Sequence, residues 1–164
     1  GTMSNEIFEV DERTMTQRLI VQSHAGSEVW GLDCHPRDHI FATGGEDRTV
    51  RIYKVSTRKP SMVRELEDGV KCVAYSPDGL LLAVGLVSGK IIILEHKKLH
   101  EVVSRHTREL PIADLKFSPD ARFLATVCLD GSLDVYDAQV EYELVGSASS
   151  TPGSGLMHLD WSAD

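Results

Sequence analysis

The sequence of 164 residues has few of the features that mark secreted or membrane proteins. Its three cysteines, Cys34, Cys72 and Cys128, are an odd number without CxxC spacing, which argues against a disulfide framework and a zinc site. No apolar run approaches the roughly 18 to 20 residues of a membrane helix, and no signal peptide is recognisable at the N-terminus. We therefore expect a soluble cytoplasmic protein whose cysteines are small buried hydrophobic residues.

Basic residues are also scarce, with 17 Lys and Arg against 25 Asp and Glu and a net charge of −8. Because phosphate groups are bound by basic surface, neither nucleic acid nor an anionic membrane is expected as a partner. The basic residues are unevenly placed. Six of them and no acid lie between Arg48 and Arg64, and none follows Arg122. Such a run is either a solvated face or a binding surface.

An internal repeat is the strongest signal in this chain, which is 41% hydrophobic and 26% charged. An apolar run ending in proline occurs at residues 30–36, 70–77 and 112–119, and a similar run begins at residue 157. Pro36 and Pro77 are 41 residues apart, Pro77 and Pro119 are 42 apart, and Pro119 and the equivalent Ala163 are 44 apart. This period is typical of propeller blades of about 40 to 45 residues, with helical solenoids as the alternative.

The local pattern within each repeat favours strands over helices. Turn residues separate short runs rich in β-branched side chains, which is typical of antiparallel strands. We name the four strands of a blade a, b, c and d. Strand a precedes each proline, and weaker d strands are expected near residues 61–66, 100–104 and 142–146. The expected b strands lie at 40–43, 80–84 and 123–126, and the c strands at 50–53, 91–94 and 133–136.

The sequence thus predicts an all-β propeller segment of fifteen strands, with three complete four-stranded blades and parts of two others. Residues 1–3 look like a cloning scar, and residues 4–23 are expected to form strands c and d of a preceding blade. The three blades are assigned to 24–67, 68–105 and 106–147, and residues 148–164 to a loop and the first strand of the next blade. Open rims and unpaired strand edges of such a segment are expected to cause self-association.

Two blades carry a polar set that resembles the WD-repeat family. In that family a His before strand a, a Ser or Thr in strand b, an Asp in the b–c turn and a Trp in strand c form a hydrogen-bonded tetrad. A buried imidazole needs a partner on each ring nitrogen, and a Tyr hydroxyl can replace the Trp donor. The matching residues are His24, Thr43, Asp47 and Tyr53 in the first blade and His106, Thr126, Asp130 and Tyr136 in the third.

The middle blade lacks all four members of the tetrad. It has no His at residues 66–70, and Val84, Ser88 and Leu94 stand at the other three positions. A partly satisfied buried network is less stable than an apolar interior, so we expect the four members to be lost together and not one at a time.

A catalytic interpretation of the same residues is weaker. Thr, His and Asp could imitate a nucleophile, a base and an orienting group, but here they recur at a structural spacing without an oxyanion motif. His96 and His100 have a spacing that suits a metal on a helix, yet they lie in an expected hairpin without a third ligand. No phosphate-binding glycine motif occurs. We expect neither an enzyme nor a bound cofactor or metal.

Two longer phrases, Ser-Glu-Val-Trp-Gly-Leu-Asp-Cys-His-Pro at 27–36 and Met-His-Leu-Asp-Trp-Ser-Ala-Asp at 157–164, resemble the echinoderm microtubule-associated protein-like family. Residues 5–8 and the blade without the tetrad also resemble that family. The resemblance implies an atypical propeller in a cytoskeletal protein that binds tubulin. The alternative is a general WD-repeat adaptor in a ciliary, ubiquitin-ligase or trafficking complex.

Partner binding is expected at the loop rims, because strands are used for packing and loops are free to vary. One of the candidates, Trp30, could instead belong to the core between two blades. The candidates are Glu28, Trp30, Arg48, Arg51 and Lys71 on the face of the d–a and b–c loops, with Arg58 and Lys59 at the outer c–d side.

Overall fold

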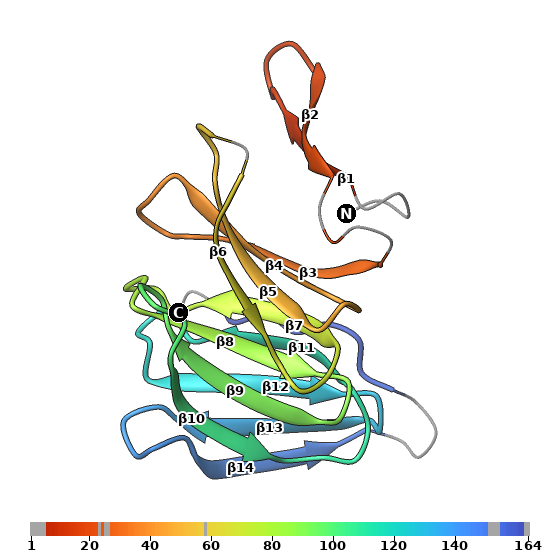
Figure 1. The fold of residues 1–164 in the computed structure, drawn as a ribbon. Helices are drawn as coiled ribbons and strands as arrows, with labels where there is room; N and C mark the ends of the chain where they lie inside the picture. The colour runs from red at the N-terminus through yellow and green to blue at the C-terminus, as the bar shows by residue number, and fades with distance from the viewer. Residues whose placement is uncertain (1–5, 23, 25–26, 58, 151–154, 163–164) are drawn as a thin grey trace.

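Fourteen strands make up the secondary structure of a computed structural model that describes residues 6–22, 24, 27–57, 59–150 and 155–162 (Figure 1). Within those ranges no helix is long and apolar enough to cross a membrane. The expected sequence features at residues 1–5, including the suggested cloning scar, lie outside the described residues.

Twelve of the strands form three antiparallel four-stranded sheets, which confirms the all-β blade architecture. Each sheet is a meander whose strands follow the chain order. The first sheet contains β3 (Val29–Cys34), β4 (Ile40–Gly45), β5 (Thr49–Lys54) and β6 (Pro60–Glu65). The second contains β7 (Val70–Tyr75), β8 (Leu81–Leu86), β9 (Lys90–Glu95) and β10 (Glu101–His106). The third contains β11 (Ile112–Phe117), β12 (Phe123–Cys128), β13 (Ser132–Asp137) and β14 (Glu143–Ser149).

The two remaining strands, β1 (Glu6–Val10) and β2 (Gln17–Gln22), form a separate antiparallel hairpin. Ile7 of this hairpin is buried in a small cluster with Phe41 and Tyr53 of the first sheet. The stacked rings of Phe41 and Tyr53 lie 5.1 Å apart. Ile7 therefore places part of the hairpin against the first sheet.

The predicted fifteenth strand is not formed, because residues 155–162 carry no strand. This segment nevertheless follows β11. The Leu159 backbone N–H donates to Asp114 Oδ2 at 3.2 Å, and Trp161 Nε1 donates to the Lys116 carbonyl at 3.0 Å. A strand requires a ladder of backbone-to-backbone hydrogen bonds, and these contacts run through side chains instead.

The hydrophobic core lies between successive sheets, so the middle sheet is covered on both faces. Its two central strands, β8 and β9, are correspondingly rich in buried apolar residues: Val84, Ile91, Ile92 and Ile93 are all at most 2% exposed. Such continuous apolar runs are expected where a strand is buried on both sides. The strands β3, β7 and β11 lie side by side at the inner edges of the three sheets (Figure 1). In a meander, the a–b and c–d turns share one end of the sheets, and the b–c and d–a connections share the other.

Candidate protein-binding site

The polar residues of the first sheet meet inside the blade. His24 is completely buried, its Nδ1 lies 2.6 Å from Asp47 Oδ1, and its Nε2 lies 2.8 Å from Thr43 Oγ1. Burial lowers the pKa of His24, although the hydrogen bond to Asp47 opposes this effect. A neutral ring that donates from Nδ1 to the carboxylate and accepts at Nε2 from the hydroxyl satisfies both nitrogens. Tyr53, the fourth expected member, is 1% exposed and stacks on Phe41.

The expected tetrad of the third sheet does not assemble around His106. The side chain of His106 is 55% exposed and faces Glu109, with 3.6 Å between Nε2 and Oε1. Inside this blade Arg108 instead donates from Nε and Nη2 to the two carboxylate oxygens of Asp134 at 2.8 and 2.6 Å. The Tyr136 hydroxyl also lies 3.3 Å from Asp134 Oδ2. Burial and the nearby Asp134 carboxylate raise the pKa of Tyr136 to about 12.

The register explains this error. His24 stands twelve residues before Pro36, and the residue twelve positions before Pro119 is Thr107. His106 is therefore displaced by one position. At the end of β10, a shift of one residue moves a side chain to the opposite face. Of the other predicted members, Thr126 is 2% exposed, and Asp130 accepts a hydrogen bond from the Ser132 backbone N–H. Neither contacts His106.

A single position of strand c distinguishes the interiors of the three sheets. Arg51, Ile92 and Asp134 each stand fifteen residues after the repeat proline. Arg51 donates to Asp47 at 2.7 Å, whereas Asp134 accepts from Arg108, so the charges are exchanged between the first and third sheets. The apolar Ile92 fits the second sheet, where Val84 and Leu94 are completely buried.

Three of the predicted rim residues form one cluster at the d–a end of the seam between the first and second sheets. Trp30 is half-buried, and its Nε1 donates to Glu28 Oε2 at 2.7 Å. Lys71 Nζ lies 4.3 Å from the centroid of the Trp30 ring, within the range of a cation–π contact. Trp30 is thus both inter-blade core and a candidate binding residue, since part of its side chain packs in the seam and part is accessible. We name Glu28, Trp30 and Lys71 the tryptophan rim.

Arg48 occupies a turn position that the other blades give to glycine. Its φ is +62°, and the matched Gly89 and Gly131, also twelve residues after the repeat proline, have φ of +80° and +85°. A side chain is strained in this left-handed region, whereas glycine is not. The exposed guanidinium of Arg48 lies 3.3 Å from Glu65.

The remaining basic candidates do not form a common surface with the tryptophan rim. The side chain of Arg51, a predicted partner-binding residue, is only 23% exposed and its guanidinium binds Asp47 inside the blade, so little of it is available to a partner. It lies there because alternate residues of β5 face the interior. Lys59 is exposed beside β6, at the opposite end from Trp30, and Arg58 lies outside the described residues.

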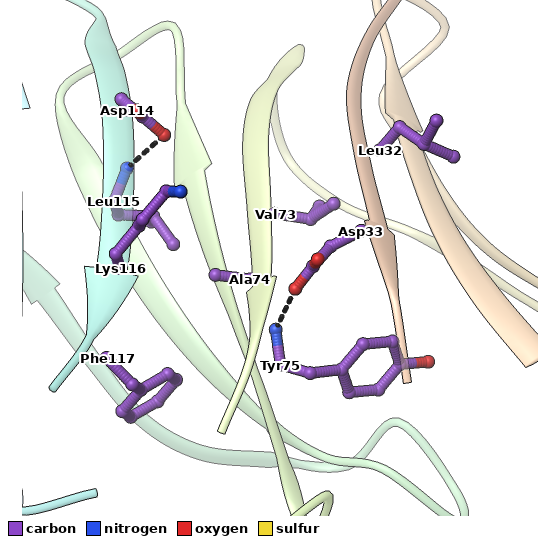
Figure 2. Close-up of a pocket in the computed structure, with 9 residues that line it drawn as sticks. All are labelled: Leu32, Asp33, Val73, Ala74, Tyr75, Asp114, Leu115, Lys116 and Phe117. Carbon is purple, nitrogen blue, oxygen red and sulfur yellow. Dashed lines mark hydrogen bonds between the residues drawn. The ribbon is translucent and has the colours of Figure 1, made fainter. Parts of the chain in front are cut away.

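The inner strands enclose a groove of about 270 Å³. Figure 2 shows Asp33 of β3 reaching across to the second sheet, where its Oδ2 accepts the Tyr75 backbone N–H at 2.7 Å. Burial raises the pKa of Asp33. Lys116 of β11 lies 3.4 Å from Asp160. The Asp33 contact satisfies a backbone N–H of an inner edge strand, which is a structural use of its charge.

One group of His and Asp residues at the a–b end has metal-ligating atoms within 4.8 Å of one another: His35, Asp38 and His96. Both nitrogens of His35 are already used, since Nε2 donates to the Gly79 carbonyl at 3.0 Å and Nδ1 accepts the Asp38 N–H at 2.9 Å. The group therefore offers fewer free ligands than a metal site of three protein ligands requires. His100, paired with His96 in the sequence, is not part of this group.

The cysteines differ in burial. Cys72 and Cys128 are buried, as expected, and burial raises the pKa of the Cys128 thiol. Cys34 is exposed, contrary to the expectation, because it is the last residue of an inner edge strand that pairs on one side only.

Comparison with known proteins assigns this geometry to a family. Residues 29–164 match the family model described as the echinoderm microtubule-associated protein second β-propeller. Echinoderm microtubule-associated protein-like 2 of Mus musculus is 34% identical over 149 residues, covering 89% of this chain and 23% of that protein. The 77 kDa echinoderm microtubule-associated protein of Strongylocentrotus purpuratus is 33% identical, covering 88% of this chain and 21% of that protein. The chain thus spans less than a quarter of these relatives.

Solved structures agree on the fold. A chain in a crystal structure of the mitotic checkpoint complex superposes with a TM-score of 0.85 at 14% identity, covering 96% of this chain and 49% of that one. A crystal structure of RRP9 WD40 repeats gives a TM-score of 0.72 at 20% identity, covering 77% of this chain and 40% of that one. With a family model matched over 29–164 and a blade architecture in agreement, the chain belongs to the echinoderm microtubule-associated protein second β-propeller family.

Proposed function

We propose that this chain is part of a non-catalytic, protein-binding propeller in a cytoplasmic, cytoskeletal protein, and that its partner is tubulin. The observation that carries the proposal is the family match over residues 29–164, together with relatives that are named as microtubule-associated proteins. A general WD-repeat adaptor is the alternative that the experiment below must separate from it.

The use of the polar residues supports a binding role over a catalytic one. His24 and Asp47, which have the residue types of a catalytic pair, are engaged with each other and with Thr43 inside the blade. His24 is completely buried, so a substrate has no path to its ring. A histidine with both nitrogens satisfied in this way holds the strands and turn together.

The tryptophan rim is the proposed contact surface. Tryptophan is enriched among the residues that dominate interface energies, and here it is flanked by one acid and one base. Lys71 gives this rim a cationic group on a chain of net charge −8, and tubulin carries strongly acidic surface.

Purified tubulin titrated against the chain at low salt tests the proposal. Saturable binding is expected, with at least about a tenfold loss of affinity in Trp30→Ala and in Lys71→Glu, because interface hot spots cost about 2 kcal/mol or more. Lys59→Glu, at the opposite end of the first sheet, is the matched control and should change affinity by less than about twofold. Absence of saturable binding would reject tubulin and favour the adaptor alternative.

Self-association of the isolated chain is a second proposal. The outer strand β14 is an edge strand with Leu144 and Val145 more than half exposed. Exposed apolar edges favour pairing between copies. Static light scattering should report more than one chain per particle, and a monomer at high concentration would contradict this proposal.

A further inference from the structure

A hollow of about 390 Å³ opens between the first and second sheets at the a–b and c–d end, opposite the tryptophan rim. We call it the first-seam pocket. Its volume lies within the range of about 300 to 1,000 Å³ that is typical of ligand pockets. Its apolar part is formed by Ile40 of β4, Ile52 of β5 and Met62 of β6, which belong to or pack against the core between the sheets.

The charged residues of the first-seam pocket are mainly basic. Lys54 and Lys97 line it and are both exposed. Within the described part of the chain, neither lysine has a carboxylate oxygen within 4.0 Å of its Nζ, and Asp38 is the acidic residue that lines the hollow. Two lysines without an ion pair beside an apolar floor favour an anionic ligand.

A buried polar group also lines the first-seam pocket. His96 is 9% exposed, and its Nδ1 is one of the buried side-chain atoms of the described residues that have no hydrogen-bond partner. Burial lowers the pKa of His96, so its ring is neutral at pH 7 and has one N–H to donate. A buried polar atom without a partner costs free energy, so the first-seam pocket has an imperfectly satisfied polar residue in its wall.

The next seam of the same chain provides an internal comparison. It has an equivalent hollow of about 730 Å³ between the second and third sheets, and its lining residues include Leu81, Ala138 and Gln139, two acids, Glu101 and Glu141, and one base, Arg105. Eighteen residues after the repeat proline the first sheet has Lys54 and the second has Glu95. Two positions further on, Lys97 of the second sheet corresponds to Gln139 of the third. An excess of basic over acidic lining residues is thus found in the hollow of the first seam and not in that of the second.

We propose that the first-seam pocket binds an extended acidic peptide segment of a partner protein. One apolar side chain of the segment packs on Ile52 and Met62, and flanking carboxylates face Lys54 and Lys97. This site is separate from the tryptophan rim and does not depend on tubulin being the partner of that rim.

A fluorescein-labelled peptide with a single Phe flanked on both sides by Glu residues is the probe, measured by fluorescence anisotropy with the whole chain at low salt. Binding should saturate, and Lys54→Glu and Lys97→Glu should each weaken it at least about tenfold. The matched control is Lys98→Glu, which makes the same charge change one residue outside the pocket and should weaken binding less than about twofold. Replacing Phe by Ala in the peptide should also weaken binding at least about fivefold, since an apolar anchor is lost.

The proposal is overturned if the peptide does not saturate, if Lys98→Glu weakens binding as much as Lys97→Glu, or if the Phe-to-Ala peptide binds equally well. The second and third results would show attraction by charge alone. The Trp30→Ala chain separates this site from the rim: it should bind the peptide normally, even if tubulin binding fails altogether.

Discussion

Arg108 and Asp134 are joined by two charge-assisted hydrogen bonds, of 2.8 and 2.6 Å, in the interior of the third sheet. The side chain of Asp134 is 3% exposed and that of Arg108 is 28% exposed. This pair replaces the expected contact of His106 with Asp130. A bidentate Arg–carboxylate pair is one of the stronger polar contacts available to a protein interior.

Removal of the arginine should strongly destabilise the third sheet. In Arg108→Ala the buried carboxylate of Asp134 loses its cation, and breaking such a pair costs about 3–5 kcal/mol of the free energy of unfolding. His106→Ala, which removes an exposed side chain, should cost less than about 0.5 kcal/mol. Urea denaturation measures both. If His106→Ala proves as damaging as Arg108→Ala, the third sheet uses the histidine after all.

The first sheet should depend on its histidine. His24→Ala or Asp47→Ala should each reduce the free energy of unfolding by about 1.5–3 kcal/mol, because each change leaves a buried partner without its hydrogen bond. Ser88→Ala, at the Asp47 position of the sheet without these contacts, should cost less than about 0.5 kcal/mol. If thermal melts show that Ser88→Ala lowers stability as much as Asp47→Ala, the polar contacts of the first sheet do not stabilise the chain.

Arg48→Gly should stabilise the chain. Its φ of +62° is strained for a side chain, and glycine relieves that strain at the cost of more freedom in the unfolded state. We expect a net gain of about 0.5–1 kcal/mol, since the exposed ion pair with Glu65 contributes little. Gly89→Ala at the matched turn should have the opposite sign, because a Cβ there would lie 2.0 Å from the Arg108 carbonyl oxygen. A loss of stability in Arg48→Gly would contradict the strain argument.

Stability should fall as the pH drops below about 6.5, the usual histidine pKa of an unfolded chain. Burial lowers the pKa of His24 and of His96 in the folded chain. The unfolded chain therefore takes up protons that the folded histidines do not, so stability is complete above about pH 6.5 and declines below it. Each histidine contributes up to about 1.4 kcal/mol per pH unit.

Urea titrations at pH 7.5 and pH 5.5 would measure this decline, and His96→Gln should make it shallower. The histidine ring signals in NMR spectra give an independent readout. Titration of either ring at a pH above its unfolded value would reverse the sign of the prediction.

The three sheets were predictable from the sequence because their signals are local. The recurring prolines, the turn residues and the β-branched runs between them specify strands within a few residues, whatever surrounds them. Residues 91–94 were predicted as a strand, and their burial on both faces is consistent with their continuous apolar sequence. The partners of His24 were predicted from its resemblance to the WD-repeat tetrad, and Thr43 and Asp47 do bind its ring.

The sequence alone therefore determined the strand pattern and the four-stranded meanders, whereas tertiary structure decided which side chains meet. His106 ends β10 with an exposed side chain, whereas Arg108, in the connection that follows the strand, reaches Asp134. The first-seam pocket likewise unites Lys54 with Lys97, which are far apart in the chain. Local patterns specify backbone conformation, but the face and the neighbour of a polar side chain depend on how separate strands align, because a shift of one residue reverses the face.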